Sequence, residues 1–97
     1  MSAYVIVHAT ITDPEKMKEY GALAGPSVKA AGGEVVSAGQ ITDVLAGSND
    51  HQRAIILRFA DAQAARDWYN SDAYQAAIPI RDQAMDAVFV ISEDPPA

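Results

Sequence analysis

The chain contains no cysteine, so neither a disulfide bridge nor a thiolate metal site can reinforce it. Basic residues are also scarce, because seven lysines and arginines stand against thirteen aspartates and glutamates, giving a formal net charge of −6. Nucleic acids and anionic membrane surfaces bind to basic faces, so we expect neither as a partner. Long apolar runs are absent too, and no stretch approaches the roughly 20 residues that a membrane helix needs.

What remains is an ordinary globular composition, with 49% hydrophobic and 21% charged residues among 97. This length predicts a single domain over residues 1–97. No lysine or arginine occurs in residues 1–12, so the basic start of a secretory signal is missing and we expect a soluble cytoplasmic protein. A domain this small leaves roughly a third or more of its unfolded surface exposed, which makes a partner chain a natural source of further burial.

Residue patterns predict four strands and two helical regions, since β-branched runs favour strands while caps and apolar residues three or four apart favour helices. The predicted strands are residues 4–11, a bent strand of 34–38 and 41–46 with Gly39 at the bend, residues 53–59 and residues 85–91. A polar turn is expected over residues 47–52 and a frayed tail over 92–97. The first helix begins at Asp13-Pro14, is interrupted or kinked at Gly25-Pro26, and ends at Gly32-Gly33. The second follows Asp61, restarts at Ser71 and is closed by Pro79, so that residues 81–83 lead into the last strand.

The resulting order, β-α-β-β-α-β, predicts an α+β ferredoxin-like fold made of two right-handed split βαβ units. Its four-stranded antiparallel sheet has both helical regions on one face. The first and third strands are largely apolar on both faces, so the second sheet face also needs cover. A second copy of the chain, packed sheet to sheet as a homodimer, is the predicted cover.

Several motifs, spread over nearly the whole chain, carry a resemblance to a known family. They are Tyr4, His8, Thr12-Asp13-Pro14, Tyr20, Gly25-Pro26, Gly32-Gly33, Gly47, Arg53, Phe59, Ala65, Trp68-Tyr69, Ser71, Tyr74-Gln75 and Arg81. With these residues the chain resembles the family numbered 1330 among the domains of unknown function, which belongs with the dimeric α/β barrels. Relatives of that superfamily include small monooxygenases and muconolactone isomerases. The resemblance implies a homodimer that binds a small organic acid or aromatic and acts on it without a cofactor.

The chain departs from the family pattern where the family usually carries charge. The usual Arg-Gly-Gly is Ala38-Gly39-Gln40 here, Leu-Glu-Gly is Leu45-Ala46-Gly47, and Glu-Phe is Arg58-Phe59. An arginine and two glutamates are therefore missing, and an arginine stands where a glutamate is usual. Because the second and third strands are expected to be neighbours, these changes predict a polar cluster that has been rewired.

Two residues are candidates for catalysis, His8 and Arg58. His8 is the only histidine in a predicted strand, where a neutral imidazole would act as a general base or serve as a structural residue with a satisfied hydrogen bond. Arg58 lies on an otherwise apolar strand, where a cation needs a partner. It would anchor a carboxylate or enolate ligand, or form an internal ion pair or a dimer contact.

Tyr4 and three further aromatic side chains, Tyr20, Trp68 and Tyr74, are candidates for ligand binding, together with neighbouring Tyr69. Aromatic residues at helical spacing belong either to a pocket or to the core, and both interpretations stay open here.

Arg81 is the remaining ligand-binding candidate. Its alternative is a structural role, in which it binds carbonyl groups at a helix end or Asp72. His51 lies in a polar turn and shares no ligand spacing with His8, and the acidic residues form no calcium-binding pattern, so we expect no metal and no cofactor.

Two classes of function follow from these candidates. In the first, each protomer holds a small-molecule pocket between sheet and helices, lined by Tyr4, His8, Tyr20, Arg58 and Trp68. In the second, the protein is a non-catalytic dimerisation or ligand-sensing module with a filled interior. The sequence does not decide whether the protein is an enzyme. An enclosed pocket that both His8 and Arg58 face would favour the first class.

Overall fold

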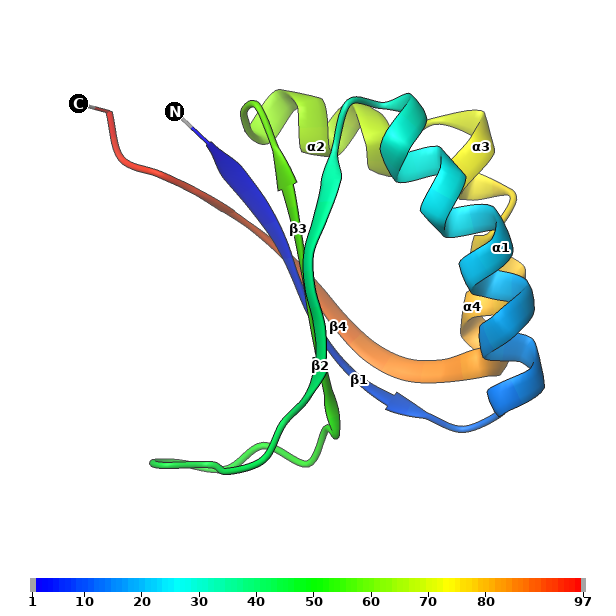
Figure 1. Cartoon of the computed structure of the whole chain (residues 1–97), viewed down its shortest axis with the longest axis vertical. Helices are drawn as coiled ribbons and strands as arrows, with labels where there is room; N and C mark the ends of the chain where they lie inside the picture. The colour runs from blue at the N-terminus through cyan, green and yellow to red at the C-terminus, as the bar shows by residue number, and fades with distance from the viewer. Residues whose placement is uncertain (1, 97) are drawn as a thin grey trace.

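The computed structural model describes residues 2–96, which form one four-stranded sheet and four helices. The elements are β1 (Ala3–Ile11), α1 (Pro14–Ala30), β2 (Glu34–Gln40), β3 (Arg53–Phe59), α2 (Ala62–Tyr69), α3 (Asp72–Gln75), α4 (Ile78–Ala84) and β4 (Met85–Glu93). The strands lie in the order β2-β3-β1-β4, with every neighbouring pair antiparallel. All four helices cover the same face of the sheet (Figure 1). The predicted α+β ferredoxin-like fold is confirmed. None of the described helices is both long and apolar enough to span a membrane.

Helix α1 begins as the sequence predicts but does not break where it predicts. The Asp13 side chain accepts hydrogen bonds from the backbone N–H groups of Glu15 and Lys16, which caps the helix. An interruption or a kink was expected at Gly25-Pro26, and the interruption is wrong, because α1 continues through Pro26 to Ala30. Its buried residues are Tyr20, Ala24, Ser27 and Val28. Packing of this face offsets the hydrogen bond that Pro26 cannot donate.

Strand β2 is shorter than predicted. The expected extension over residues 41–46 is wrong, since β2 ends at Gln40 and residues 41–52 leave the sheet without forming a strand. Strand β3 begins only at Arg53, so an extension of β2 would have no neighbour to accept its hydrogen bonds. The register shift also differs from the prediction, because it lies between Val35 and Ser37 rather than at Gly39.

The chain before β4 is helical, which the sequence analysis missed. Residues 81–83, expected to lead directly into the strand, belong to α4. Pro79 was expected to close the preceding helical turn, but it lies in the first turn of α4. Proline is tolerated there because the backbone N–H groups of the first turn have no partner within the helix. Strand β4 then runs to Glu93, two residues further than predicted, by pairing Glu93 with Ala3.

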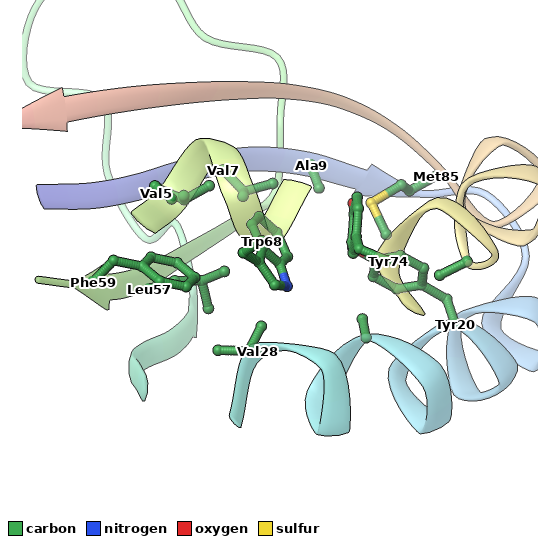
Figure 2. Packing of buried hydrophobic residues seen from close by; sticks show 13 residues of the cluster. Val5, Val7, Ala9, Tyr20, Val28, Leu57, Phe59, Trp68, Tyr74 and Met85 are labelled. Carbon is green, nitrogen blue, oxygen red and sulfur yellow. The ribbon is translucent and has the colours of Figure 1, made fainter. Parts of the chain in front are cut away.

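The core lies between the sheet and the helices. Alternation along β1 sends Val5, Val7 and Ala9 toward the helices, and all three are buried. Figure 2 shows Trp68 between these β1 residues and Val28 of α1. The opposite face of the sheet has no helix over it (Figure 1). We call it the open face. Its residues on β1 and β4 include Ile6, His8, Val88 and Val90.

Candidate functional site

The helix side of the sheet carries a cluster of aromatic rings from four different elements. Tyr20 comes from α1, Trp68 and Tyr69 from α2, Tyr74 from α3, and Phe89 from β4. Ring centroids lie 4.3 Å apart for Trp68 and Tyr74 and 5.1 Å apart for Tyr69 and Tyr74. Short elements position these rings: Ser71 caps α3 through its hydroxyl, and this places Tyr74 against Trp68.

A chain of hydrogen bonds runs through this cluster to Arg81. The hydroxyl oxygens of Tyr20 and Tyr74 lie 2.8 Å apart. Arg81 Nη1 donates to the hydroxyl of Tyr69 at 2.9 Å and to that of Tyr74 at 3.3 Å, while its Nε donates to Asp82 at 3.3 Å. Either hydroxyl can donate in the Tyr20–Tyr74 bond, because the Tyr74 oxygen has a second lone pair besides the one that accepts from Arg81. The expected contact of Arg81 with Asp72 or with helix-end carbonyls is replaced by these contacts.

Burial sets the charges in this network. Burial raises the pKa of both Tyr20 and Tyr74 above the usual value for tyrosine, so both phenols are neutral near pH 7. Burial by itself lowers the pKa of Arg81, but hydrogen bonds to Tyr69 and Tyr74 outweigh it and leave that pKa raised. Arg81 therefore remains cationic although its side chain is only 16% exposed. Its guanidinium lies 5.0 Å from the centre of the Phe89 ring.

Several hollows adjoin the network, and two of them lie beside Tyr20 and Arg81. The first, which we call the interior cavity, has a volume of about 150 Å³, lies between α1, α2 and the sheet, and is partly open, because its lining includes the exposed residues Val35 and Ala38 of β2. Its lining is almost wholly apolar: Val7, Tyr20, Ala24, Gly25, Val28, Val35, Ala38, Ile55, Leu57, Trp68, Met85 and Phe89.

The second hollow, which we call the Arg81 hollow, has a volume of about 510 Å³ and a largely polar lining. It is formed by Tyr69, Arg81, Asp82, Met85, Asp86, Ala87 and Phe89. Met85 and Phe89 line both hollows, so these two side chains stand between the apolar space and the cation.

The structure divides the residues that the sequence analysis grouped into one pocket. Tyr20 and Trp68 lie in the core, whereas Tyr4, His8 and Arg58 lie on the open face. The register shows this directly, because Tyr4 pairs with Arg58 and His8 pairs with Ala54 on that face. The expected pocket lined by all five residues is therefore wrong: β1 separates its two halves.

His8 is held by a neighbouring loop rather than exposed to the interior cavity. Asn49 Oδ1 accepts from the backbone N–H of His51 at 2.9 Å, so Asn49 Nδ2 is the atom that donates to His8 Nδ1 at 2.8 Å. A neutral His8 ring that accepts at Nδ1 carries its proton on Nε2. His8 therefore offers a hydrogen-bond donor at its free nitrogen. His51, expected in solvent, is half-buried, with Nδ1 3.1 Å from Thr10 Oγ1.

Arg58 is paired, as a cation on an apolar strand requires. Its guanidinium forms an ion pair with Glu34 across β2 and β3, and each side chain is about half exposed. The second and third strands are neighbours, as predicted, and Arg58 on β3 lies opposite Glu34 on β2. An ion pair this exposed contributes about 0–1 kcal/mol.

Some residues of the cluster were missed. The Trp68 Nε1–H donates to Ser27 Oγ at 3.0 Å, and Ser27 Oγ donates to the Ala24 carbonyl at 2.7 Å. Nothing in the sequence indicates that Ser27 of α1 is buried against Trp68 of α2. Phe89 was detectable, because it occupies the same β4 face as Ala87 and pairs with Val7 of the core. Among residues 2–96, no three acidic or histidine side chains come together as a metal site would need.

Solved structures share this fold over almost the full chain. A protein of unknown function from Rhodopseudomonas palustris has a TM-score of 0.78 and 21% identity, covering 99% of this chain and 84% of that one. A dimeric ferredoxin-like protein of unknown function from Jannaschia sp. CCS1 has a TM-score of 0.74 and 16% identity, with coverage of 97% and 100%. SnoaB, a cofactor-independent oxygenase from Streptomyces nogalater, has a TM-score of 0.70 and 10% identity, with coverage of 99% and 95%.

At these identities the likeness establishes the fold alone. No curated protein matches the chain. The family comparison goes further, because a single family model spans residues 2–95, almost the entire sequence. The chain belongs to the family described as domain of unknown function DUF1330.

Proposed function

We propose that the protein is a homodimer and that each protomer binds a small, mainly apolar molecule carrying one acidic group. The observation that supports this most directly is the apolar interior cavity beside a half-buried cation. Ligand sites are typically apolar hollows with a few placed polar groups. An apolar cavity of about 150 Å³ is large enough for a benzene-sized group.

In this proposal, the apolar part of the ligand packs against Trp68 and Val28, and its acidic group points past Met85 and Phe89 toward Arg81. A guanidinium binds a carboxylate, phenolate or enolate through charge-assisted hydrogen bonds. The neutral phenol of Tyr20, which lines the cavity, adds a hydrogen-bonding group without adding charge. A small aromatic acid or phenol combines these features.

The open face supports the homodimer. It carries Ile6, Ile56, Val88 and Val90, and the two valines are about half exposed. Contiguous exposed apolar surface of this kind marks an interaction site. The Jannaschia protein, which has the same fold, is described as dimeric, as is another structural neighbour from Thermobifida fusca.

Catalysis without a cofactor is the second candidate, favoured by the fold shared with SnoaB. Oxygenation or isomerisation of an aromatic or enolic acid passes through an anion, and a fixed cation with phenol donors would stabilise that charge. In this proposal, Arg81 supplies the cation and Tyr20 the phenol, while Tyr74 holds both through its hydroxyl. His8 and Arg58 lie on the other side of the sheet from the cavity, so neither contacts a ligand there in this proposal.

The test is a thermal-shift titration with benzoate, salicylate and phenol, with toluene as the uncharged control. We expect benzoate or salicylate to raise the melting temperature of the wild type more than toluene does. Val28→Phe fills the cavity with an apolar ring and keeps the core apolar, so it should fold and lose the response. His8→Ala should keep it.

The comparison of Arg81→Lys with wild type tests the acidic group. A lysine retains the charge but not the planar fork, so the preference for benzoate over toluene should fall. If no compound stabilises the wild type, or if Val28→Phe responds as the wild type does, the proposed pocket is wrong. Oxygen consumption by wild type with the compounds that bind then tests the catalytic candidate.

A further inference from the structure

Residues 41–52 form a twelve-residue segment that we call the arm. It leaves the sheet after β2 and returns at the start of β3 without a strand or helix of its own. In Figure 1 it is the green segment that projects from one end of the sheet, on the side away from the helices. Loops of this length without secondary structure are uncommon in compact domains and usually have a function.

The base of the arm is fixed to the sheet by backbone hydrogen bonds. Ile41 N–H donates to the Gln52 carbonyl at 2.8 Å, which closes the base. Gln52 N–H then donates to the Ala9 carbonyl of β1 at 3.1 Å. The direction in which the arm projects is therefore set by the sheet itself.

Side chains from β1 reinforce this anchor. His8 accepts from Asn49, and Thr10 is bonded to His51. Both β1 residues belong to the open face, so the returning half of the arm rests on that face. His8, Thr10, Asn49 and His51 thus hold the arm in place.

The tip of the arm is apolar and uncovered. Leu45 is 96% exposed and the adjacent Val44 is 46% exposed. By comparison, Leu23 of α1 is 40% exposed but lies on a helix whose other side is packed. Leu45 differs, because it is held out from the sheet by an anchored base.

We propose that the arm clasps a second copy of this chain, with Val44 and Leu45 docking on the open face of the partner. This rests on the proposed homodimer and adds the element that secures it. Because the arm projects on the side of the open face, any two-fold pairing of open faces brings each arm alongside the other sheet. The contact is then made twice, once by each arm.

The size of the sheet gives the arm a part in the interface. Its four strands are seven to nine residues long, and with a spacing of about 4.8 Å and a rise of about 3.3 Å per residue they cover a projected area of about 500 Å². A stable interface takes about 800 Å² from each partner. The flat projection of the open face is smaller than this accessible area, and a twelve-residue arm from each copy adds to the contact.

The lack of cysteine makes a clean test possible. A single thiol is introduced as Leu45→Cys, with Leu23→Cys on the helix side as the matched control, and alkylation rates are measured from nanomolar to high micromolar protein. We expect the Leu45→Cys thiol to be protected at least tenfold at concentrations where sedimentation shows a dimer, and to react freely on dilution. The Leu23→Cys thiol should react at one rate throughout.

A second pair of variants measures what the tip contributes. Leu45→Asp should raise the dimer dissociation constant at least tenfold, whereas Leu23→Asp should leave it unchanged. If the protein is a dimer and the Leu45→Cys thiol reacts equally at every concentration, the arm proposal is overturned while the homodimer stands. If the wild type sediments as a monomer at every concentration, both are overturned.

Discussion

The two faces of the sheet differ in what covers them, because the helices pack on one face only (Figure 1). The helix face carries the aromatic residues and a continuous hydrogen-bonded chain from Tyr20 to Arg81. The open face carries His8, the Arg58–Glu34 ion pair and a layer of aliphatic residues. The same strands supply both faces, because alternate residues point to opposite sides. The helix face is a filled core with a small cavity, and the open face is a surface shaped for contact.

The largest difference between the faces should appear in stability. Trp68 is buried and touches Phe59, Tyr69 and Tyr74, so Trp68→Ala should lower the free energy of unfolding by about 3–5 kcal/mol. Val88→Ala, on the open face, should change it by no more than about 0.5 kcal/mol in the monomer. Urea denaturation at low protein concentration measures both values. Equal losses for the two variants would contradict the division into core and surface.

The arrangement of elements was predictable because several local signals agreed. Asp13 and Ser71 cap the helices that the sequence predicts, and the apolar run of β1 forms a strand. The arm was not predictable, since residues 41–46 have the β-branched pattern of a strand. That pattern does not say whether a neighbouring strand exists to pair with, and here β3 begins too late.

The candidate site was predicted in part for a related reason. The stripe of Tyr4, Ile6 and His8 and the stripe of Val5, Val7 and Ala9 are both mostly apolar, so composition does not tell which one faces the helices. The predicted pocket assumed that the stripe of Tyr4, Ile6 and His8 faces the helices. That assumption placed His8 and Arg58 beside Trp68, whereas both lie on the open face. By contrast, Tyr20, Trp68, Tyr74 and Arg81 were selected as ligand-binding candidates, and the structure brings these four side chains into one connected cluster around the core. Their role in binding remains a proposal.

The helix face should also impose a pH dependence on the stability of the protein. Burial raises the pKa of Tyr20 and Tyr74 in the folded protein, whereas in the unfolded chain both titrate near pH 10. Above about pH 10 the unfolded state loses these protons and the folded state retains them, so stability is fully present below pH 10 and falls as the pH rises. Each buried phenol contributes a slope of up to about 1.4 kcal/mol per pH unit.

Denaturation of wild type and Tyr20→Phe between pH 8 and pH 11 measures this slope. The variant removes one of the two titrating groups, so its loss of stability above pH 10 should be about half as steep. Identical slopes for wild type and Tyr20→Phe would mean that Tyr20 is not protected from solvent in the folded state.

The smallest expected effect concerns the ion pair of the open face. Arg58 and Glu34 are about half exposed, so solvent screens their attraction. A double-mutant cycle with Arg58→Met and Glu34→Gln, measured on the dilute monomer, should give a coupling energy between about 0 and 1 kcal/mol. Added salt should reduce it further. A coupling well above this range in the monomer would show that the pair is desolvated by the chain itself, which an uncovered face does not allow. The same cycle at high protein concentration then shows whether a second copy covers the pair, because removing one partner of a desolvated pair leaves an unpaired charge and costs more.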